Sequence, residues 1–510
     1  MSRQVEVVGG GPAGLYVARL LKLAEPELRV VVHERLGSDA ETFGFGVGLT
    51  EATMRNLANA DPETADQIRH ASFAGHTLDF RRAHDNITLH GARNLAIGRA
   101  TLLRILEDAA TRVGVEIRTG AKADVTTTAG ADVIIAADGV RSSTRRKLSA
   151  DLGVGEILGR SRFVWCGADF AVDSAFFAAA EAPQGLFVAH AYPYADDRST
   201  FLIEVDEDTW VSANLGGLDA VVPAGETDHA SVEILNRVFE DALHGRPLLT
   251  NRTRWGRFTT LTLDRWSVGN TVLIGDAAHT AHYTLGSGTK LALEDSIALA
   301  EALRGESSVA AAFAAYEQAR REPVERFKRL ASRSQAWWDS YRVRADRPIG
   351  ELALSYMTRA GNLGIADYAR DQLEHVRTAL SWLGDNVPID PSMLDDWVLS
   401  RPLTSLNLPA REVDSHTLDR TCAHESIEWN SSRVWDELAD AALHAARQNL
   451  SIPLLVTGDN DLESIGARID LAERIRLQTG RVVGVLLPAA ARAQAAAAVG
   501  AGRADFIVRG

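Results

Sequence analysis

The chain has 510 residues, of which 46% are hydrophobic and 24% charged, the composition of an ordinary soluble globular protein with room for about two or three domains. Its formal net charge of −14 argues against a nucleic-acid partner and against an anionic membrane surface, so an anionic ligand needs a local basic patch. Cys166 and Cys422 are too far apart for a disulfide framework or a metal site, and we expect no metal and a reducing, cytoplasmic compartment. No signal peptide or membrane-spanning run is evident, and the Arg-rich, Ala-rich composition indicates a bacterial genome.

The first thirty-five residues carry the pattern of a dinucleotide-binding unit. A predicted strand at 5–8 leads into a glycine-rich turn at 9–14, an apolar helix follows, and a second strand ends in Glu34. Glu34 stands twenty residues past the last glycine and can accept hydrogen bonds from both ribose hydroxyls. In the turn, Gly9 permits the tight bend, Gly11 lets the backbone approach a pyrophosphate, and Gly14 lets the helix pack closely on the strand. The N-terminus of that helix attracts the phosphates.

The middle of the chain alternates between helical and strand-like patterns. Residues 43–49 form a glycine-punctuated segment that cannot be a regular helix, and it is either a plain surface loop or backbone passing close to a flat ligand. The remaining elements are predicted from periodicity: helices at 51–70 and from Arg99 to 110, short alternating stretches at 73–97, and strands at 115–117 and 131–136.

Residues 160–265 differ in character, since short apolar runs are separated by Pro, Gly and Asp clusters, which favours a largely antiparallel sheet. We predict its strands at 163–166, 186–192, 200–205 and 210–213. The earlier pattern returns at 272–276, so the first domain is predicted to be discontinuous, and a long helical stretch follows at 310–380. Past a polar, irregular segment at 406–433, helices at 435–449, 462–478 and 489–499 alternate with strands at 453–457, 482–487 and 506–508.

Three further motifs follow predicted strands. They are Asp138-Gly139-Val140-Arg141-Ser142-Ser143-Thr144-Arg145, Gly275-Asp276-Ala277-Ala278-His279, and Gly286-Ser287-Gly288-Thr289. Each by itself could be a strand-to-helix turn with a capping acid. In this order and at these separations, together with the N-terminal turn, they resemble the class A flavoprotein monooxygenases, in which an FAD domain carries an inserted substrate sheet. The resemblance covers roughly residues 1–380.

This resemblance implies a fold and a set of domains. We expect an α/β (α+β) chain with a Rossmann-type FAD-binding domain, an inserted and mostly antiparallel substrate sheet, and a small α/β C-terminal domain. The implied boundaries are 1–160 with 266–305 for the FAD-binding domain, 161–265 for the sheet, 306–385 for a helical segment, and 390–510 for a truncated barrel-like domain.

The resemblance also implies roles for individual residues. The ADP half of FAD is held by the glycine turn and Glu34, Arg99 lies beside the flavin, and Asp138 is linked to FAD and to the nicotinamide donor. Asp276 bonds the ribityl–phosphate stretch, and the helix from Gly288 aims its positive end at the N1/C2 edge of the flavin. The implied FAD-binding residues are Gly9, Gly11, Pro12, Ala13, Gly14, Glu34, Arg35, Arg99, Asp138, Gly275, Asp276, Gly286, Ser287, Gly288 and Thr289.

One departure from the family pattern stands beside the flavin motif: Tyr283 replaces the usual proline. Tyr283 and His282 are therefore expected near the isoalloxazine, and His190 and Tyr192 are further candidates for substrate contact. Each of these side chains could instead be a core or wall residue. We assign His190, His282 and Tyr283 as the candidate catalytic residues, which would deprotonate or hydrogen-bond a ring hydroxyl or enol.

A finer resemblance is to the salicylyl-CoA 5-hydroxylase and anthraniloyl-CoA monooxygenase branch. In the latter an old-yellow-enzyme-like barrel follows, and residues 400–403 look like its beginning, while 471–476 and 501–506 look like its end. The middle is missing, so we predict a remnant that binds no FMN and serves in packing, dimer contact or covering a substrate entrance. The stretches that carry the finer resemblance are 163–165, 190–194, 199–201, 275–282, 286–292 and 320–326.

The function implied is FAD-dependent, NAD(P)H-consuming hydroxylation, with O₂, of an aromatic or related cyclic acyl-CoA thioester through a C4a-hydroperoxyflavin. Two alternatives stay open: oxygenation of a seven-membered-ring CoA ester in tropolone-type biosynthesis with loss of the thioester, and a non-catalytic flavin-binding regulatory protein. A homodimer is also left open. The helix that contains Arg320, Arg321, Arg326, Lys328, Arg329 and Arg333 is either the patch for the CoA phosphates or a solvated helix face.

Overall fold

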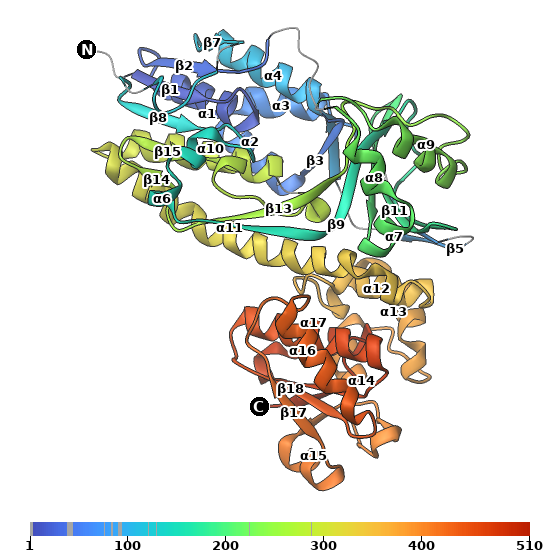
Figure 1. Ribbon diagram of the computed structural model, residues 1–510. Helices are drawn as coiled ribbons and strands as arrows, with labels where there is room; N and C mark the ends of the chain where they lie inside the picture. The colour runs from blue at the N-terminus through green and yellow to red at the C-terminus, as the bar shows by residue number, and fades with distance from the viewer. Residues whose placement is uncertain are drawn as a thin grey trace. The chain divides into compact units, whose positions relative to one another are not determined.

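The computed structural model describes residues 4–37, 44–75, 77–82, 85–89, 94–120, 122–128, 130–223, 225–286 and 288–510. Its contacts separate two compact units. The first contains residues 1–83 and 92–331, and the second contains residues 84–91 and 332–510 (Figure 1). The division of the chain into four domains stays a prediction.

The first unit is built on a Rossmann-type sheet whose strand order is β14-β15-β8-β1-β2-β7. All neighbouring pairs are parallel except the β14–β15 hairpin. Because β15 lies beside β8 although the whole antiparallel sheet separates them in sequence, this sheet is assembled from two distant parts of the chain. Its strands are β1 (Gln4–Val8), β2 (Arg29–His33), β7 (Glu116–Arg118), β8 (Val133–Ala136), β14 (Ser267–Val268) and β15 (Thr271–Leu273).

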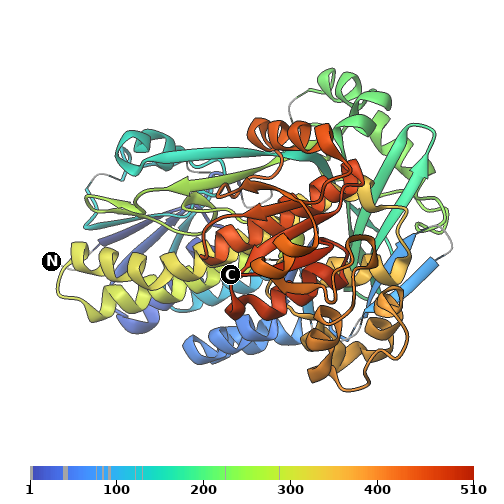
Figure 2. The same ribbon diagram turned by 90° about the horizontal axis from the view of Figure 1, so that it is seen from below.

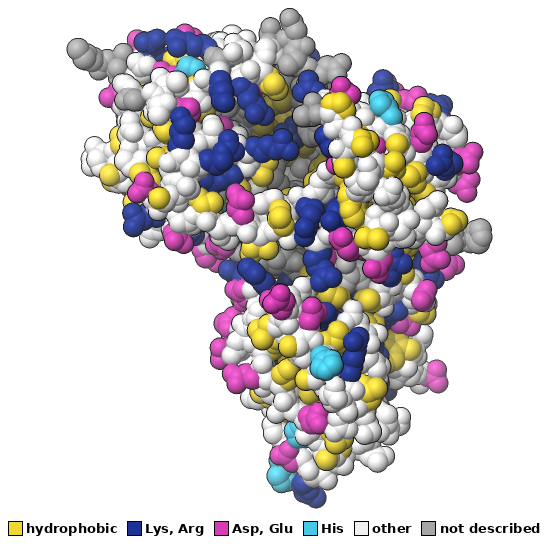
Figure 3. Space-filling view, in the orientation of Figure 1, with side chains coloured by type: hydrophobic (Ala, Val, Ile, Leu, Met, Phe, Trp, Pro, Cys, Tyr) yellow, Lys and Arg dark blue, Asp and Glu magenta, His cyan; other side chains and the backbone are white. Residues whose placement is uncertain are grey.

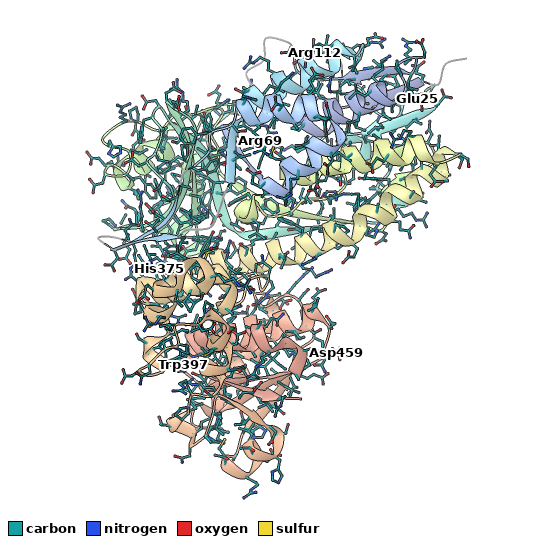
Figure 4. The ribbon with its side chains drawn as sticks, turned by 180° about the vertical axis from the view of Figure 1, so that it is seen from behind. Glu25, Arg69, Arg112, His375, Trp397 and Asp459 are labelled. Atoms are coloured by element: carbon teal, nitrogen blue, oxygen red, sulfur yellow. The ribbon has the colours of Figure 1, made fainter. Side chains whose placement is uncertain are left out.

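Helices cover this sheet and bury apolar faces against it. Helix α1 packs on α4 and α10, and its Arg19 is a buried cation that pairs with Asp61 at 2.6 Å. Arg112 at the end of α4 pairs with Glu63 of α3 at 3.2 Å (Figure 4). The helices are α1 (Pro12–Ala24), α2 (Glu51–Ala60), α3 (Pro62–His70), α4 (Arg99–Arg112), α5 (Ser143–Lys147), α6 (Ser149–Leu152), α10 (Gly288–Gly305) and α11 (Val309–Asp339), with single turns η1 (Gly275–Ala277) and η2 (Tyr283–Leu285).

A second sheet in this unit has the order β13-β9-β12-β11-β10-β4. It is antiparallel except for the parallel pair β10–β4. One face carries an apolar core that includes Val164, Phe201 and Ile203 and is covered by short helices. The elements are β4 (Leu78–Arg82), β9 (Val154–Ala168), β10 (Ala175–Ala182), β11 (Gly185–Ala195), β12 (Arg198–Val205), β13 (Gly256–Leu263), α7 (Glu207–Ser212), α8 (Leu215–Ala220) and α9 (His229–Val238).

Two local predictions are corrected here. Residues 210–213 were expected to be a strand, but 207–212 form α7, because Asp206 caps a helix by accepting a hydrogen bond from the backbone N–H of Thr209 at 2.9 Å. The segment expected to be a loop at 43–49 contains a strand, β3 (Gly46–Thr50), which pairs with β6 (Asn94–Gly98). Phe43 lies outside the described residues.

The second unit is built on a five-stranded sheet in which every neighbouring pair is parallel. Its order, β16-β20-β19-β18-β17, places the first strand beside the last, and we call this five-stranded sheet the arc. Figure 2 shows the elements of this unit from below, in orange and red. The barrel-like character of the domain stays a prediction. The segment predicted to be irregular at 406–433 contains β16, α15 and β17. The strands are β16 (Glu412–Asp414), β17 (Glu425–Glu428), β18 (Leu454–Thr457), β19 (Val483–Leu487) and β20 (Phe506–Arg509), with β5 (Asp85–Leu89) also in this unit.

Helices surround the arc, and the predicted helices and strands beyond residue 435 are all present within a few residues of their expected ends. The helices of this unit, beyond the end of α11, are α12 (Ile349–Thr358), α13 (Ile365–Leu380), α14 (Leu394–Leu399), α15 (Ser415–Thr421), α16 (Glu437–Ala446), α17 (Leu462–Thr479) and α18 (Arg492–Gly500). Within the described part of the chain, no helix is both long enough and apolar enough to cross a membrane. Both cysteines are free.

A buried ion network ties the helical segment to the arc inside the second unit. Glu473 of α17 lies 2.9 Å from Arg503 and 3.2 Å from Arg344, and its side chain is 4% exposed. Burial disfavours the charged carboxylate, but Arg344 and Arg503 outweigh burial and lower the pKa of Glu473 from 4.5 to about 2. A neighbouring pair, Arg333 and Asp470, meets at 2.9 Å through two parallel hydrogen bonds.

The Asp295 carboxylate of α10 is the corresponding hub of the first unit. It accepts hydrogen bonds from the backbone N–H of Gly275 at 3.0 Å and from Arg320 Nε at 2.9 Å, and it contacts His279 Nε2 at 2.7 Å. Burial alone would raise its pKa, but His279 and Arg320 hold the pKa of Asp295 below its ordinary 3.8. Asp295 therefore fixes the turn after β15 to α10 and α11 as a charged group.

We expect Glu473 to make the second unit acid-sensitive. Because its folded-state pKa is depressed, its stabilisation is complete above about pH 4.5 and is lost as the pH falls towards 2, a difference of about 3 kcal/mol. Urea unfolding measured at pH 5 and pH 3 should show a smaller loss of stability in Glu473→Gln than in the wild type. An equal loss in both proteins would contradict this assignment.

Replacing Asp295 by Asn removes a fully buried charge that faces Arg320 and leaves that cation with Glu294 alone, at 3.2 Å. We expect the free energy of unfolding of the first unit to fall by about 3 kcal/mol, measured by urea unfolding. Glu301→Gln on the same helix changes an exposed acid and is the control, with no expected effect. Equal stabilities of Asp295→Asn and Glu301→Gln would show that the network contributes nothing.

Candidate active site

The glycine turn between β1 and α1 is shaped to receive a phosphate. A Cβ atom on Gly9, whose φ is 109°, would lie 2.3 Å from the Ala137 carbonyl oxygen, and one on Gly14 would lie 2.0 Å from the Gly9 oxygen. Gly11, in contrast, has no atom within 4 Å of its Cβ position, and as N-cap of α1 it makes no side-chain cap. Helix α1 begins with Pro12 and Ala13. The free N–H groups of its first turn therefore lie beside the open space at Gly11, where a pyrophosphate fits.

Glu34 stands at the end of β2 and braces this turn. Its carboxylate accepts hydrogen bonds from the backbone N–H of Gly10 and of Leu36, both at 2.8 Å. Arg35, next in the chain, is exposed. The bonds from Glu34 to a ribose and the participation of Arg35 stay predictions.

The two motif acids behave differently. Asp138 accepts from the backbone N–H of Ser143 at 2.9 Å and of Thr144 at 3.1 Å, so its carboxylate helps to cap α5 beside the N-cap residue Ser142, in line with the alternative interpretation of this motif. Asp276 is exposed, and no side-chain hydrogen bond to its carboxylate occurs within the described residues. Of the two, Asp276 is the acid that is open to a ligand.

Asp276 lies where the remaining flavin motifs converge. Its Oδ1 is 3.6 Å from the Cβ position of Gly288, the first residue of α10, and it interacts electrostatically with Arg99, the exposed first residue of α4. Gly286 adopts a left-handed φ of 64° just before α10, and Thr289 lies in the first turn of that helix. Ser287 lies outside the described residues. A helix N-terminus, an acid and a cation thus face one place, which suits the phosphate and flavin ends of FAD.

Arg145, which the sequence analysis did not single out as a site residue, joins the two strand-end motifs. Its buried guanidinium donates to the Ala277 carbonyl oxygen at 2.9 Å and also to the Val140 carbonyl oxygen. The fixed side chain of Arg145 therefore locks the 138–145 turn onto the 275–279 turn.

Basic side chains border a hollow on the first unit, over the region of α10, α2 and α3 (Figure 3). The helix proposed for the CoA phosphates contributes little open charge, because Arg320 pairs with Asp295 and Glu294, and Lys328 pairs with Glu325 at 2.9 Å. Arg333 pairs with Asp470 in the second unit. These pairings argue against an open patch for the CoA phosphates, and because Arg320 and Lys328 are buried they do not form a solvated face either.

The face of the antiparallel sheet opposite its apolar core carries the candidate catalytic groups. Strand register places His190 opposite Leu202, Leu202 opposite Trp165, and Glu204 opposite Phe163, so these side chains share one face. The alternate residues, such as Val164, Phe201 and Ile203, enter the core. Strand periodicity thus separates packing residues from site residues.

Tyr283 and His282 come to the same face from the loop after β15. The Tyr283 ring centroid is 5.1 Å from that of Phe163, 5.9 Å from Trp165 and 6.4 Å from His190. The His282 ring lies 4.1 Å from that of Tyr283, tilted by 32°, and 4.8 Å from that of Phe258, and its Nδ1 is 3.1 Å from Thr284 Oγ1. The three predicted catalytic residues are therefore brought together among aromatic rings.

Glu204 is the residue that the sequence analysis missed. Its carboxylate accepts a hydrogen bond from the Tyr283 hydroxyl and lies 3.6 Å from His190 Nε2, and its side chain is 5% exposed. Burial disfavours its charge, yet His190 and His282 outweigh burial and hold the pKa of Glu204 below its ordinary 4.5. The only signal in the sequence was an acid within an otherwise apolar strand, Thr200-Phe201-Leu202-Ile203-Glu204-Val205.

Tyr192 has a structural contact of its own. Its hydroxyl donates to the Gly46 carbonyl oxygen at 2.8 Å, and burial raises the pKa of Tyr192 to about 12. On the same strand pair, Thr200 Oγ1 accepts from the Gly46 N–H at 2.9 Å. These bonds hold β3 against the sheet, which makes Tyr192 a wall residue of the site.

Comparisons with known proteins identify the family of the chain. A family model described as FAD binding domain matches residues 2–331. Salicyloyl-CoA 5-hydroxylase of Streptomyces sp is 36% identical over 379 residues, which cover 72% of this chain and 72% of that protein. The 3-hydroxy-4-methyl-anthranilyl-[aryl-carrier protein] 5-monooxygenase of Streptosporangium sibiricum is 37% identical over 369 residues, covering 72% and 97%.

Among solved structures, the tetrameric form of 2-methyl-3-hydroxypyridine-5-carboxylic acid oxygenase superposes with a TM-score of 0.53 at 20% identity, covering 72% of this chain and 98% of its own. At that identity the likeness concerns the fold. The strand–glycine turn–helix, the open Asp276 and the matches of sequence and fold lead to one assignment. The chain belongs to the FAD binding domain family and, within it, to the FAD-dependent aromatic monooxygenases.

Proposed function

We propose that this protein uses FAD, NAD(P)H and O₂ to hydroxylate the ring of an aromatic thioester, with water as the second product. The single observation that carries the proposal is the cluster of His190, Glu204 and Tyr283 among aromatic rings, in the unit that also carries the flavin motifs. The sequence relatives support the substrate class, since one is named for a CoA ester and the other for an aryl-carrier protein. Experiment must decide whether the thioester carrier of the substrate is CoA or a carrier protein.

The chain's own groups fit FAD. Gly11 and the N-terminus of α1 offer an open cradle to the pyrophosphate, and Asp276, Arg99 and the N-terminus of α10 surround the place of the flavin end. When bound, FAD supplies the redox chemistry: it takes electrons from the nicotinamide donor and passes one oxygen atom from O₂ to the substrate. We also propose that Asp138 positions the start of α5 in this site, because it accepts hydrogen bonds from the first N–H groups of that helix.

The protein's contribution to the reaction is orientation, a dry pocket and charge. The edges of Phe163, Trp165, Phe177 and Phe258 form walls for a flat ring. A ring hydroxyl directed at His190 or His282 could transfer its proton to an imidazole or be stabilised as an oxyanion, which makes the ring a better nucleophile towards an electrophilic oxygen. We assign this role to His190 and His282, and we assign Tyr283 to orienting the hydroxyl.

The compartment and assembly remain part of the proposal. The free thiols of Cys166 and Cys422 support a reducing, cytoplasmic location. A homodimer and an FMN-free barrel remnant are proposed on the sequence resemblance, and the arc of five strands supports the latter.

The first expected result concerns flavin reduction. Anaerobic mixing with NADPH, followed by absorbance near the flavin maximum, should show reduction accelerated by on the order of tenfold or more by salicylyl-CoA but not by free salicylate. A seven-membered-ring CoA ester that alone accelerates reduction would replace the benzenoid substrate. A flavin-loaded protein indifferent to every aryl thioester would contradict the proposed substrate class and favour a non-catalytic flavin-binding protein.

The second expected result concerns the two histidines. His190→Phe and His282→Phe should each lower the rate of product formation by about 10²-fold, while NADPH oxidation continues and releases hydrogen peroxide, because the ring is no longer activated. His70→Phe changes an exposed histidine of the same unit and should behave as wild type. Coupled turnover that is unchanged in both His190→Phe and His282→Phe would remove them from the mechanism.

A further inference from the structure

We propose that Glu204 is a positioning residue of this monooxygenase, whose carboxylate orients the Tyr283 hydroxyl and holds the His190 ring on the same face of the sheet. This inference deepens the proposed function and rests on it for its catalytic meaning. The arrangement of the three side chains is a property of the fold and can be tested by itself.

The place of Glu204 in the sheet is unusual for an acid. It lies on the central strand β12, with Phe163 of β9 on one side and Val188 of β11 on the other, and its side chain is 5% exposed. An ionised carboxylate in such a place costs several kcal/mol unless partners compensate it. The acid on β12 therefore requires both hydrogen bonds and a counter-charge.

Only a few groups near Glu204 can provide these. From β11 His190 faces it, and from the loop after β15 His282 and Tyr283 face it, whereas β9 contributes the rings of Phe163 and Trp165. Within the described residues, no Lys or Arg forms an ion pair with Glu204. The polar partners that the structure gives this carboxylate are the Tyr283 hydroxyl and His190 Nε2, which lies 3.6 Å from Oε2.

The two carboxylate oxygens have separate tasks. Oε1 accepts the hydrogen bond from Tyr283, which precedes Gly286 and α10, and Oε2 faces His190 on the sheet. One side chain thus couples the loop at the start of α10 to the face that binds the ring. A substrate oxygen on this face would then meet a fixed imidazole and an oriented phenol.

Glu204→Gln is the direct test, because glutamine keeps the size of the side chain while it removes the charge that strengthens the hydrogen bond from Tyr283. We expect product formation to fall by about tenfold, with a lower ratio of product to NADPH consumed and unchanged reduction of the flavin by NADPH. Tyr283→Phe should lower that ratio in the same way, and Glu204→Gln should add little in a Tyr283→Phe background. Glu207→Gln, three residues further on and exposed beside Arg162, is the matched control and should leave the ratio unchanged.

A double-mutant cycle on the FAD-loaded full-length protein separates this inference from the proposed function, because it needs no turnover. Urea unfolding of Glu204→Gln, Tyr283→Phe and the double variant should give effects that are not additive, because both changes act on the same hydrogen bond. Additive effects overturn the proposal, as does a ratio of product to NADPH in Glu204→Gln that equals that of the wild type. Failure of every aryl thioester to be turned over would count against the proposed function alone.

Discussion

The first unit depends on a carboxylate that water does not reach. Asp295 is completely buried, and it holds the turn after β15 through the Gly275 N–H while it balances Arg320 and His279. A buried charge tolerates few geometries, because each partner that moves away leaves another group without compensation. The strand end that presents Asp276 is therefore fixed from behind, which a loop held only by apolar contacts could not achieve.

The turn after β15 is rigid, and on the other side of the site the side chains of β11 and β12 alternate between two environments. Along β11 and β12, successive side chains go to the apolar core or to the pocket, so that Phe201 and Ile203 pack while Glu204 and His190 remain available to a ligand. The same two-residue period lets a short strand serve stability and chemistry together. Tyr283 closes the arrangement from a distant part of the chain, because the discontinuous Rossmann-type sheet returns there at β15.

The second unit combines an open parallel sheet with a buried ion network. Within the described residues the five-stranded arc leaves the outer edges of β16 and β17 unpaired. The ion network around Glu473 and Asp470 joins α17 and Arg503, which follows α18, to the end of α11 and to the segment around Arg344. These buried pairs specify one arrangement of helices around the arc, which is the best-supported role of such pairs in proteins.

The sequence by itself determined the elements whose signals are local. The glycine turn could be predicted because only glycine satisfies the positive φ and close approach at Gly9 and the close approach at Gly14, and the parallel strands could be predicted from their apolar runs. The FAD family was also evident, since its motifs are contiguous. Residues 210–213 were misassigned because a cap at Asp206 overrode an apolar, strand-like pattern. Only the tertiary structure decided that Asp138 is used as a cap while Asp276 is open, and that Glu204 meets His190 and Tyr283. Those outcomes depend on burial and on register between distant segments, and no local pattern encodes which buried acid finds which partner.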